Sequence, residues 1–214
     1  MAYARTTWVD YPATTTEITA ARLNNIETGI LAVEAASGTG VYTTEAARDA
    51  AITSPTEGQR AYITASTETT AVGATTTAIP TGIQTIYNGS VWVTVTEVGA
   101  FSYASSQALT TSYADLTVGG IKTQAILRTG TTALVSVAGR SLATANYYFL
   151  NVATATASAP TFGEVANNGA VVTSGKTFVF TGLTAGLNTF TVQGKLNAGA
   201  GTWDYLSLVV KGIA

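Results

Sequence analysis

The sequence predicts a mainly β protein that begins with one short helix, and three observations indicate this fold class. Near the N-terminus, apolar residues recur at helical spacing. From residue 101 onward they instead form short alternating runs that end at Gly or Asn, with no helical pattern between them. Thr, which is stiff at χ1 and suits a half-exposed pleated surface, supplies much of the polar remainder. Together these features are typical of an antiparallel, jelly-roll-like β-sandwich.

The predicted helix spans residues 19–37, with Thr19 as its N-cap and the Gly-containing segment 37–40 at its end. Its apolar residues have the spacing of a coiled-coil seam: Leu23, Ile26, Ile30 and Val33. Arg22 and Glu27 take the g and e positions, at which neighbouring parallel chains pair. Ile at both core positions favours trimers, so the seam predicts a homotrimer. The alternative is a helix that packs on its own domain.

The seam is short. Two heptads rise only about 26 Å, too little to hold a trimer without help. We therefore expect the domain that follows to share the contacts between chains.

Residues 1–18 precede any expected element and form a predicted attachment segment. They carry Trp8, Val9 and Tyr11, apolar residues that cannot bury themselves locally. Exposed apolar groups of this kind usually contact a partner surface. Packing against the base of the helix is the alternative for the two aromatic residues.

Residues 41–98 are predicted to form a small module that contains a hairpin. Segment 43–52 is expected to be a short helix and "GQRAYITAS" a strand. "IQTIYNGSVWVTV" predicts a β-hairpin, with Asn88 and Gly89 in a two-residue type I′ turn. Tyr87 and Trp92 flank this turn and are expected to form the core of the module. The segment between the strands, "TETTAVGATTTAIPTG", is expected to be a polar loop.

Residues 101–214 are predicted to form the sandwich. The expected strands are 112–118, 133–143, 147–155, 176–183, 188–196 and 204–213, and "GGIKT" (119–123) is expected to be a turn. Consecutive aromatic residues at 147–149 must point to both faces of their strand, whereas Trp203 and Tyr205 are two apart and should share a face. Four aromatic residues are therefore candidates for an exposed ligand surface or, as the favoured reading, for the trimer interface: Tyr147, Tyr148, Trp203 and Tyr205.

The composition argues against catalysis and against several classes of partner. The chain has no His and no Cys, which removes imidazole bases and thiolate metal sites, and we expect no cofactor. Paired carboxylates could still hydrolyse a glycan. The second half of the chain, however, offers only Asp115, Glu164 and Asp204, each in a different expected strand or loop. Hydrolysis is therefore the minor alternative.

The charge distribution and the hydropathy exclude further classes of partner. The net charge is −2, with −5 in residues 1–100 and +3 in residues 101–214, and only 10% of residues are charged. This balance predicts neither nucleic acid nor an anionic membrane as partner. No apolar run reaches the roughly 18–20 residues that cross a bilayer, and the start lacks the apolar stretch of a signal peptide. We therefore expect synthesis in a cytoplasm and no membrane insertion.

Three segments resemble phage tail-fibre and minor tail proteins. "TTWVDYPATTTEITAARLNNIETGI" (6–30) is similar to the N-terminal stretch of many such proteins. "ARDAAITSPTEGQRAYI" (47–63) followed by "IYNGSVWV" (86–93) resembles a small domain common in these fibres. "FTGLTAGLNTFTVQGKL" (180–196) is similar to strands of a phage jelly-roll tip.

The resemblance implies a short homotrimeric virion fibre or spike. In such an arrangement the N-terminal segment with Trp8, Val9 and Tyr11 would attach to other virion proteins of the tail or capsid. The C-terminal β-domain would face the host and bind a surface glycan or protein. Because the sequence has no shaft repeats or collagen-like stalk, the resemblance implies a short fibre or a decoration on the head.

Overall fold

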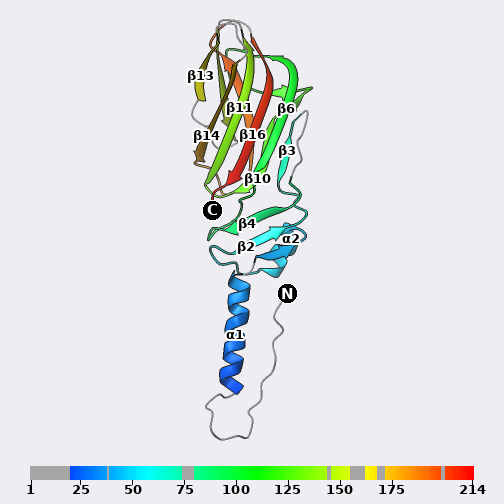
Figure 1. The fold of residues 1–214 in the computed structure, drawn as a ribbon, viewed down its shortest axis with the longest axis vertical. Helices are drawn as coiled ribbons and strands as arrows, with labels where there is room; N and C mark the ends of the chain where they lie inside the picture. The colour runs from blue at the N-terminus through cyan, green and yellow to red at the C-terminus, as the bar shows by residue number, and fades with distance from the viewer. Residues whose placement is uncertain are drawn as a thin grey trace.

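The computed structural model describes residues 20–37, 39–73, 80–143, 146–154, 162–167, 172–198 and 201–214. These residues form three parts that follow one another along the long axis of the molecule (Figure 1). A single helix leads into a small α+β module, and the module leads into a two-sheet β-sandwich. The chain is therefore mainly β, as the sequence predicts. No described helix is long and apolar enough to cross a membrane.

Helix α1 (Ala20–Ser37) matches the predicted helix closely. It ends at Ser37, just before Gly38, as expected for Gly beyond a helix end. Strand β1 (Gly40–Tyr42) begins only three residues later, so a very short connection joins the helix to the module. The helix projects from the module, away from the sandwich (Figure 1).

The module consists of one four-stranded sheet and a short helix. The sheet has the order β1-β2-β4-β5, in which β1 runs parallel to β2 and the other neighbours are antiparallel. Its further elements are β2 (Arg60–Ile63), β4 (Ile83–Tyr87), β5 (Trp92–Thr94) and α2 (Glu45–Ala51). Thr44 caps α2 by accepting a hydrogen bond from the Ala47 N–H at 3.1 Å.

A buried arginine lies at the centre of the module. Arg48 of α2 is 1% exposed, and its guanidinium lies 4.5 Å from the centroid of the Trp92 ring. Trp92 in turn makes an edge-to-face contact with Tyr87 at 5.6 Å. The guanidinium also donates hydrogen bonds to Asp49 at 2.9 Å and to Thr85 at 3.3 Å, so several of its N–H groups have a partner. The expectation that Tyr87 and Trp92 form a core is confirmed, with Arg48 as a member that the sequence did not indicate.

The predicted hairpin is present, but the predicted turn type is wrong. Tyr87 pairs with Trp92, so four residues rather than two connect β4 to β5. The Asn88 side-chain oxygen accepts hydrogen bonds from the N–H groups of Ser90 and Val91, which stabilises the wider loop. A two-residue turn with positive φ at both positions lies elsewhere. It is formed by Gly119 and Gly120, within the segment that was expected to be a turn.

The sandwich contains two sheets, which we call the front sheet and the back sheet. The front sheet has the order β14 (Val172–Thr181), β11 (Thr132–Ala143), β16 (Gly201–Gly212) and β6 (Val98–Ala108). The back sheet has the order β13 (Phe162–Asn167), β12 (Asn146–Ala153), β15 (Gly186–Leu196), β10 (Gln124–Thr129) and β3 (Thr70–Val72). Strand β7 (Ala114–Asp115) also pairs with β15, and β8 (Thr117–Val118) pairs with β9 (Ile121–Lys122).

The strand order is jelly-roll-like. When the eight main described strands are numbered 1 to 8 along the chain, from β6 and β10 to β16, the front sheet reads 6-3-8-1 and the back sheet 5-4-7-2. Successive strands therefore pass repeatedly from one sheet to the other, as in a double-sheet jelly roll. Inward-facing residues of both sheets form one core, whose larger members include Leu127, Val135, Tyr148, Phe180, Phe190, Trp203, Leu206 and Leu208.

One segment that the sequence places in a loop of the module belongs to the sandwich instead. Residues Thr70–Val72 were expected to lie in a polar loop of the module, but they form β3 and pair with Gln124–Ile126 of β10. The expectation was wrong because the edge of β10 offers unpaired backbone groups, which a short Thr-Ala-Val segment can satisfy. Nearby, Arg128 of β10 donates to both carboxylate oxygens of Glu68, at 2.6 and 2.9 Å. The module and the sandwich are therefore joined by backbone pairing and by an ion pair.

Candidate functional site

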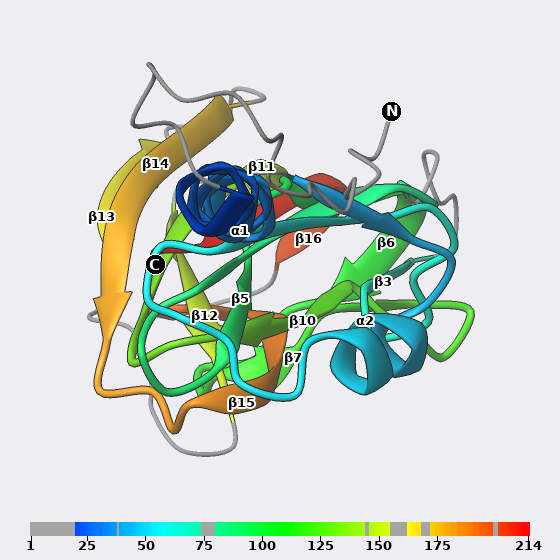
Figure 2. The ribbon, with the colours of Figure 1, turned by 90° about the horizontal axis from the view of Figure 1, so that it is seen from below.

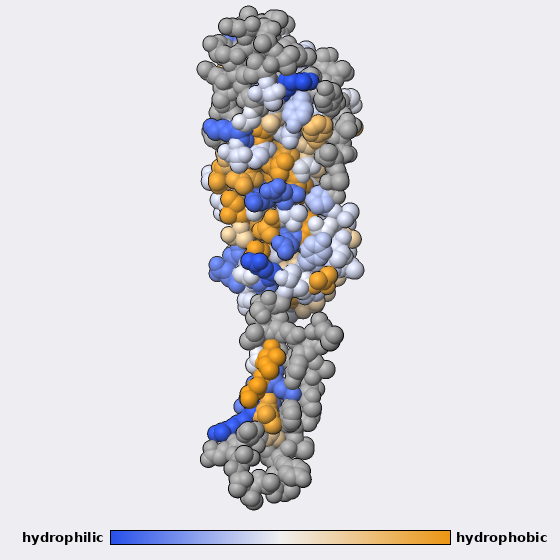
Figure 3. All heavy atoms as spheres, in the orientation of Figure 1, coloured by the Kyte–Doolittle hydropathy of each residue, from blue (hydrophilic) through white to orange (hydrophobic). Residues whose placement is uncertain are grey.

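The predicted oligomerisation seam lies on the projecting helix and is partly exposed. Ile26 is 58% exposed and Ile30 44% exposed, whereas Leu23 is half-buried. The side chain of Val33 lies outside the described residues. Figure 3 shows an apolar stripe along the visible face of α1. Large apolar side chains on a projecting helix are unusual in a protein that acts alone, so this stripe is the first candidate site.

The charged residues beside the seam behave differently from each other. Arg22 is exposed, as a g position should be. Glu27 is only 4% exposed. The pairing of Glu27 with an Arg22 of a neighbouring chain stays a prediction. The attachment residues Trp8, Val9 and Tyr11 lie outside the described residues.

Two of the four candidate aromatic residues are buried in the sandwich core. Tyr148 is 1% exposed and Trp203 is fully buried, so the expectation that they lie at a surface or interface was wrong. The Tyr148 hydroxyl donates to the Gly139 carbonyl at 2.9 Å, which connects the back sheet to the front sheet. Burial raises the pKa of this hydroxyl well above its usual range. The side chain of Tyr147 lies outside the described residues.

A β-bulge explains why Trp203 and Tyr205 do not share a face. Arg140 of β11 pairs with Tyr205, but Ser141 pairs with Trp203, so Asp204 is an extra residue in β16. An extra residue reverses the alternation of side chains along a strand. Trp203 therefore points into the core and donates to Gln107 at 3.2 Å. Tyr205 is half-buried on the other face, where it contacts Phe101 edge-to-face at 5.1 Å.

A small hollow lies on the outer face of the back sheet, beside β7, β12 and β15, and we call it the Asp115 groove. Its volume is about 260 Å³, and it is lined by Asp115, Ala153, Thr154, Thr189, Thr191 and Gln193. Residues 189, 191, 193 and 195 alternate along β15 and so share one face. Lys195, the last of them, lies over the rings of Tyr113 and Phe149, at 4.6 and 5.1 Å from their centroids. The groove thus combines amide, hydroxyl and carboxylate groups with nearby aromatic rings.

The carboxylate of Asp115 is held by two neighbours. Lys122 lies 2.7 Å from one oxygen, and the Gln193 side-chain amide donates to the other at 2.9 Å. Burial of Asp115 opposes ionisation, but the hydrogen bonds from Lys122 and Gln193 together outweigh it and hold the pKa below its usual value. Sequence reasoning did not find this cluster, because Asp115 and Gln193 are far apart in the chain and no motif joins them.

The three carboxylates considered for hydrolysis lie on separate strands. Asp115 is in β7, Glu164 in β13 and Asp204 in β16, which belongs to the front sheet. Strands β12 and β15 separate β13 from β7, which places their backbones roughly 14 Å apart at about 4.8 Å per strand. Glycosidase carboxyl pairs lie about 5–9.5 Å apart. Among the described residues, no group of three or more acidic residues is placed to hold a metal ion.

Comparisons with known proteins assign no family. The chain matches no family model and no curated protein sequence. Among solved structures, it is similar to a chain of the infectious bursal disease virus Gx strain, with a TM-score of 0.33, 9% identity, and coverage of 64% of this chain and 42% of that one. It thus spans less than half of the viral chain. A carbohydrate-binding module from Cellvibrio mixtus lichenase 5A, solved with cellotriose, gives a TM-score of 0.27 and 17% identity, with coverage of 51% and 95%. Similarities of this size carry no functional assignment.

Proposed function

We propose that this chain is a structural virion protein, a short homotrimeric phage fibre or spike that presents its β-sandwich to the host surface. The observation that carries the proposal is the projecting helix α1 with exposed Ile26 and Ile30, at the opposite end of the molecule from the sandwich (Figure 1). A helix of this length is marginal alone, and burial of its stripe between chains would stabilise it. The segment before the helix would attach to the tail or, as the alternative, to the capsid as a decoration.

The sandwich would act as the adhesive tip, with a surface glycan as its ligand. The Asp115 groove supports this part of the proposal because its lining offers several hydrogen-bonding groups to a hydroxyl-rich ligand. Gln193 and Thr191 lie on one face, and Phe149 and Tyr113 nearby supply aromatic surface. The separation of the carboxylate-bearing strands favours binding over hydrolysis, so we propose no catalytic step.

The trimer is tested by changing the seam. In Ile26→Asp, three carboxylates would meet in the seam, and we expect the trimer to dissociate while the sandwich stays folded. Asn25→Asp adds the same charge at another exposed position of α1 and should leave the trimer intact. Native mass spectrometry measures both variants. Equal oligomeric states for the two variants would contradict a role for the seam.

Attachment and adhesion need separate experiments. Deletion of residues 1–12 should leave trimers that no longer join particles, and normal incorporation of this variant would contradict attachment through the N-terminus. For adhesion, the purified chain is applied to a glycan array. Gln193→Ala should lose binding that Gln84→Ala, at an exposed position of the module, retains. Absence of binding by the unchanged chain, or equal binding by both variants, would contradict a glycan site in the Asp115 groove.

A further inference from the structure

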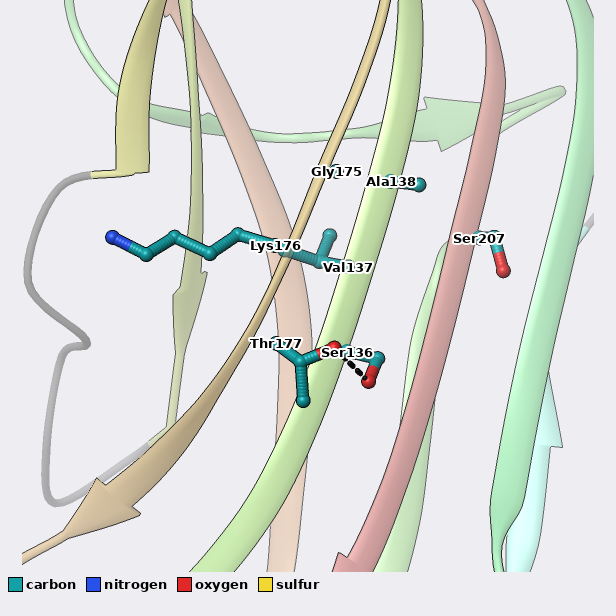
Figure 4. Close-up of a pocket in the computed structure, with 7 residues that line it drawn as sticks. All are labelled: Ser136, Val137, Ala138, Gly175, Lys176, Thr177 and Ser207. Carbon is teal, nitrogen blue, oxygen red and sulfur yellow. Dashed lines mark hydrogen bonds between the residues drawn. The ribbon is translucent and has the colours of Figure 1, made fainter.

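The outer face of the front sheet has a hollow at its centre, and most of the residues that line the hollow are small and uncharged. Its outward residues include Ser136 and Ala138 of β11, Gly175 and Thr177 of β14, and Ser207 of β16; with two neighbours they line a hollow of about 270 Å³. Figure 4 shows Ser136 and Thr177 joined by a hydrogen bond of 2.7 Å, while the Lys176 side chain points away from the hollow. Because Gly175 has no side chain, nothing rises from the floor of the hollow at that position.

Apolar side chains lie on the same face as this hollow, and charged groups lie toward the ends of the sheet. Val179 of β14 is 52% exposed, and Phe101 contacts Tyr205 on the same face. Among the described residues of this face, Arg140 lies toward one end of β11, and Lys211 lies toward the other end of the sheet, 3.7 Å from Glu97. Figure 3 shows apolar residues gathered over this face. A neutral, partly apolar centre with charges at its margins is the pattern of a protein–protein interface.

The position of α1 indicates what covers this face. Seen from below, the helix projects beneath the side of the sandwich formed by β11, β14 and β16, away from β12, β10 and β15 of the back sheet (Figure 2). The apolar stripe of α1 and the front sheet are visible in the same view of the molecule (Figure 3). If the stripes of three copies meet on a threefold axis along α1, each copy must turn its front sheet toward that axis.

We propose that the outer face of the front sheet is covered by neighbouring copies of this chain, so that the sandwich continues the trimer interface that begins at α1. This inference rests on the proposed trimer and adds which face of the sandwich lies inside it. The helix alone is too short to hold a trimer, so a second contact surface is required on energetic grounds. The same arrangement leaves the back sheet, with the Asp115 groove, on the outside of the assembly.

The test uses thiol labelling, because the chain has no Cys and a single introduced Cys reports one position. Thr177→Cys places a thiol on the front face, and Leu187→Cys places a matched thiol on the back sheet, where Leu187 is 57% exposed. In the trimer, we expect Thr177→Cys to react with a maleimide roughly tenfold or more slowly than Leu187→Cys, because labelling requires the interface to open. In the double variant Ile26→Asp with Thr177→Cys, dissociation of the trimer should restore fast labelling of the thiol.

The outcomes separate this inference from the proposed function. A trimeric mass with equal labelling rates would overturn the inference and leave the trimer standing. A monomeric mass for the unchanged chain would overturn both. As a second test, Ala138→Glu places a charge at the centre of the face and should weaken the trimer, whereas Thr189→Glu on the back sheet should not. If Ala138→Glu assembles as the unchanged chain does, the front face is not the interface.

Discussion

The hydrogen bond between Tyr148 and Gly139 joins the two sheets of the sandwich, and its removal gives a measurable prediction. In Tyr148→Phe the ring remains, but the buried hydroxyl that donates to the Gly139 carbonyl at 2.9 Å is lost. A typical hydrogen bond contributes about 1 kcal/mol net, and an acceptor left buried without this donor adds a further penalty. We therefore expect a loss of about 1–2 kcal/mol in the free energy of unfolding.

This loss should appear as a fall in melting temperature. For a chain of this size, 1 kcal/mol corresponds to about 2–4 °C, so the variant should melt about 2–8 °C lower. Circular dichroism follows unfolding at fixed protomer concentration, because assembly makes melting concentration-dependent. Tyr62→Phe, at a residue 37% exposed in the module, is the control and should change stability by less than about 0.5 kcal/mol. Equal melting of Tyr148→Phe and the unchanged chain would refute the stabilising role of the hydrogen bond from the Tyr148 hydroxyl to the Gly139 carbonyl.

Three further predictions concern the core, the module and the Asp115 groove. Gly139→Ala should cost about 1–3 kcal/mol, because its Cβ would lie 2.8 Å from Leu150 and 3.1 Å from the Tyr148 hydroxyl; unchanged denaturant stability would contradict this packing. Arg48→Ala should destabilise the module by about 2–3 kcal/mol through lost packing and cation–π contact, seen as faster hydrogen exchange in β2 and β4; unaltered exchange would contradict its central place. Because the folded-state pKa of Asp115 is lowered, its contribution to stability is present above the unfolded pKa of about 3.9 and is lost as pH falls through the folded value. Asp115→Asn should therefore flatten the pH dependence of stability below about pH 4, and an unchanged pH profile would argue against the Lys122 and Gln193 contacts.

The helices and strands that the sequence predicts correctly are those that depend on patterns within their own segments. The spacing of apolar residues and the Gly at position 38 are local features, and α1 ends where they indicate. Alternation likewise locates the strands around Val135, Phe190 and Leu208, because each buries every second side chain. The order of these strands in two sheets follows from the jelly-roll-like winding that short strands without helices favour.

The features that the sequence did not predict depend on distant partners. Strand β3 exists because β10 provides an edge for it, and nothing within Thr70–Val72 identifies that edge. The bulge at Asp204 reverses the faces of Trp203 and Tyr205, although their spacing alone implies a shared face. Asp115 meets Gln193 only because β7 pairs with β15. In each case, long-range pairing decides the environment of a residue whose local pattern is ambiguous.

The central claim is that three copies of this chain assemble side by side, and the mass in solution tests it most directly. One chain has a mass of 21.9 kDa, so three chains have a mass of about 66 kDa. Light scattering on the purified full chain at micromolar concentration should give this value across a dilution series. A mass of about 22 kDa at every concentration would contradict the trimer, the role of the α1 seam and the buried front face together.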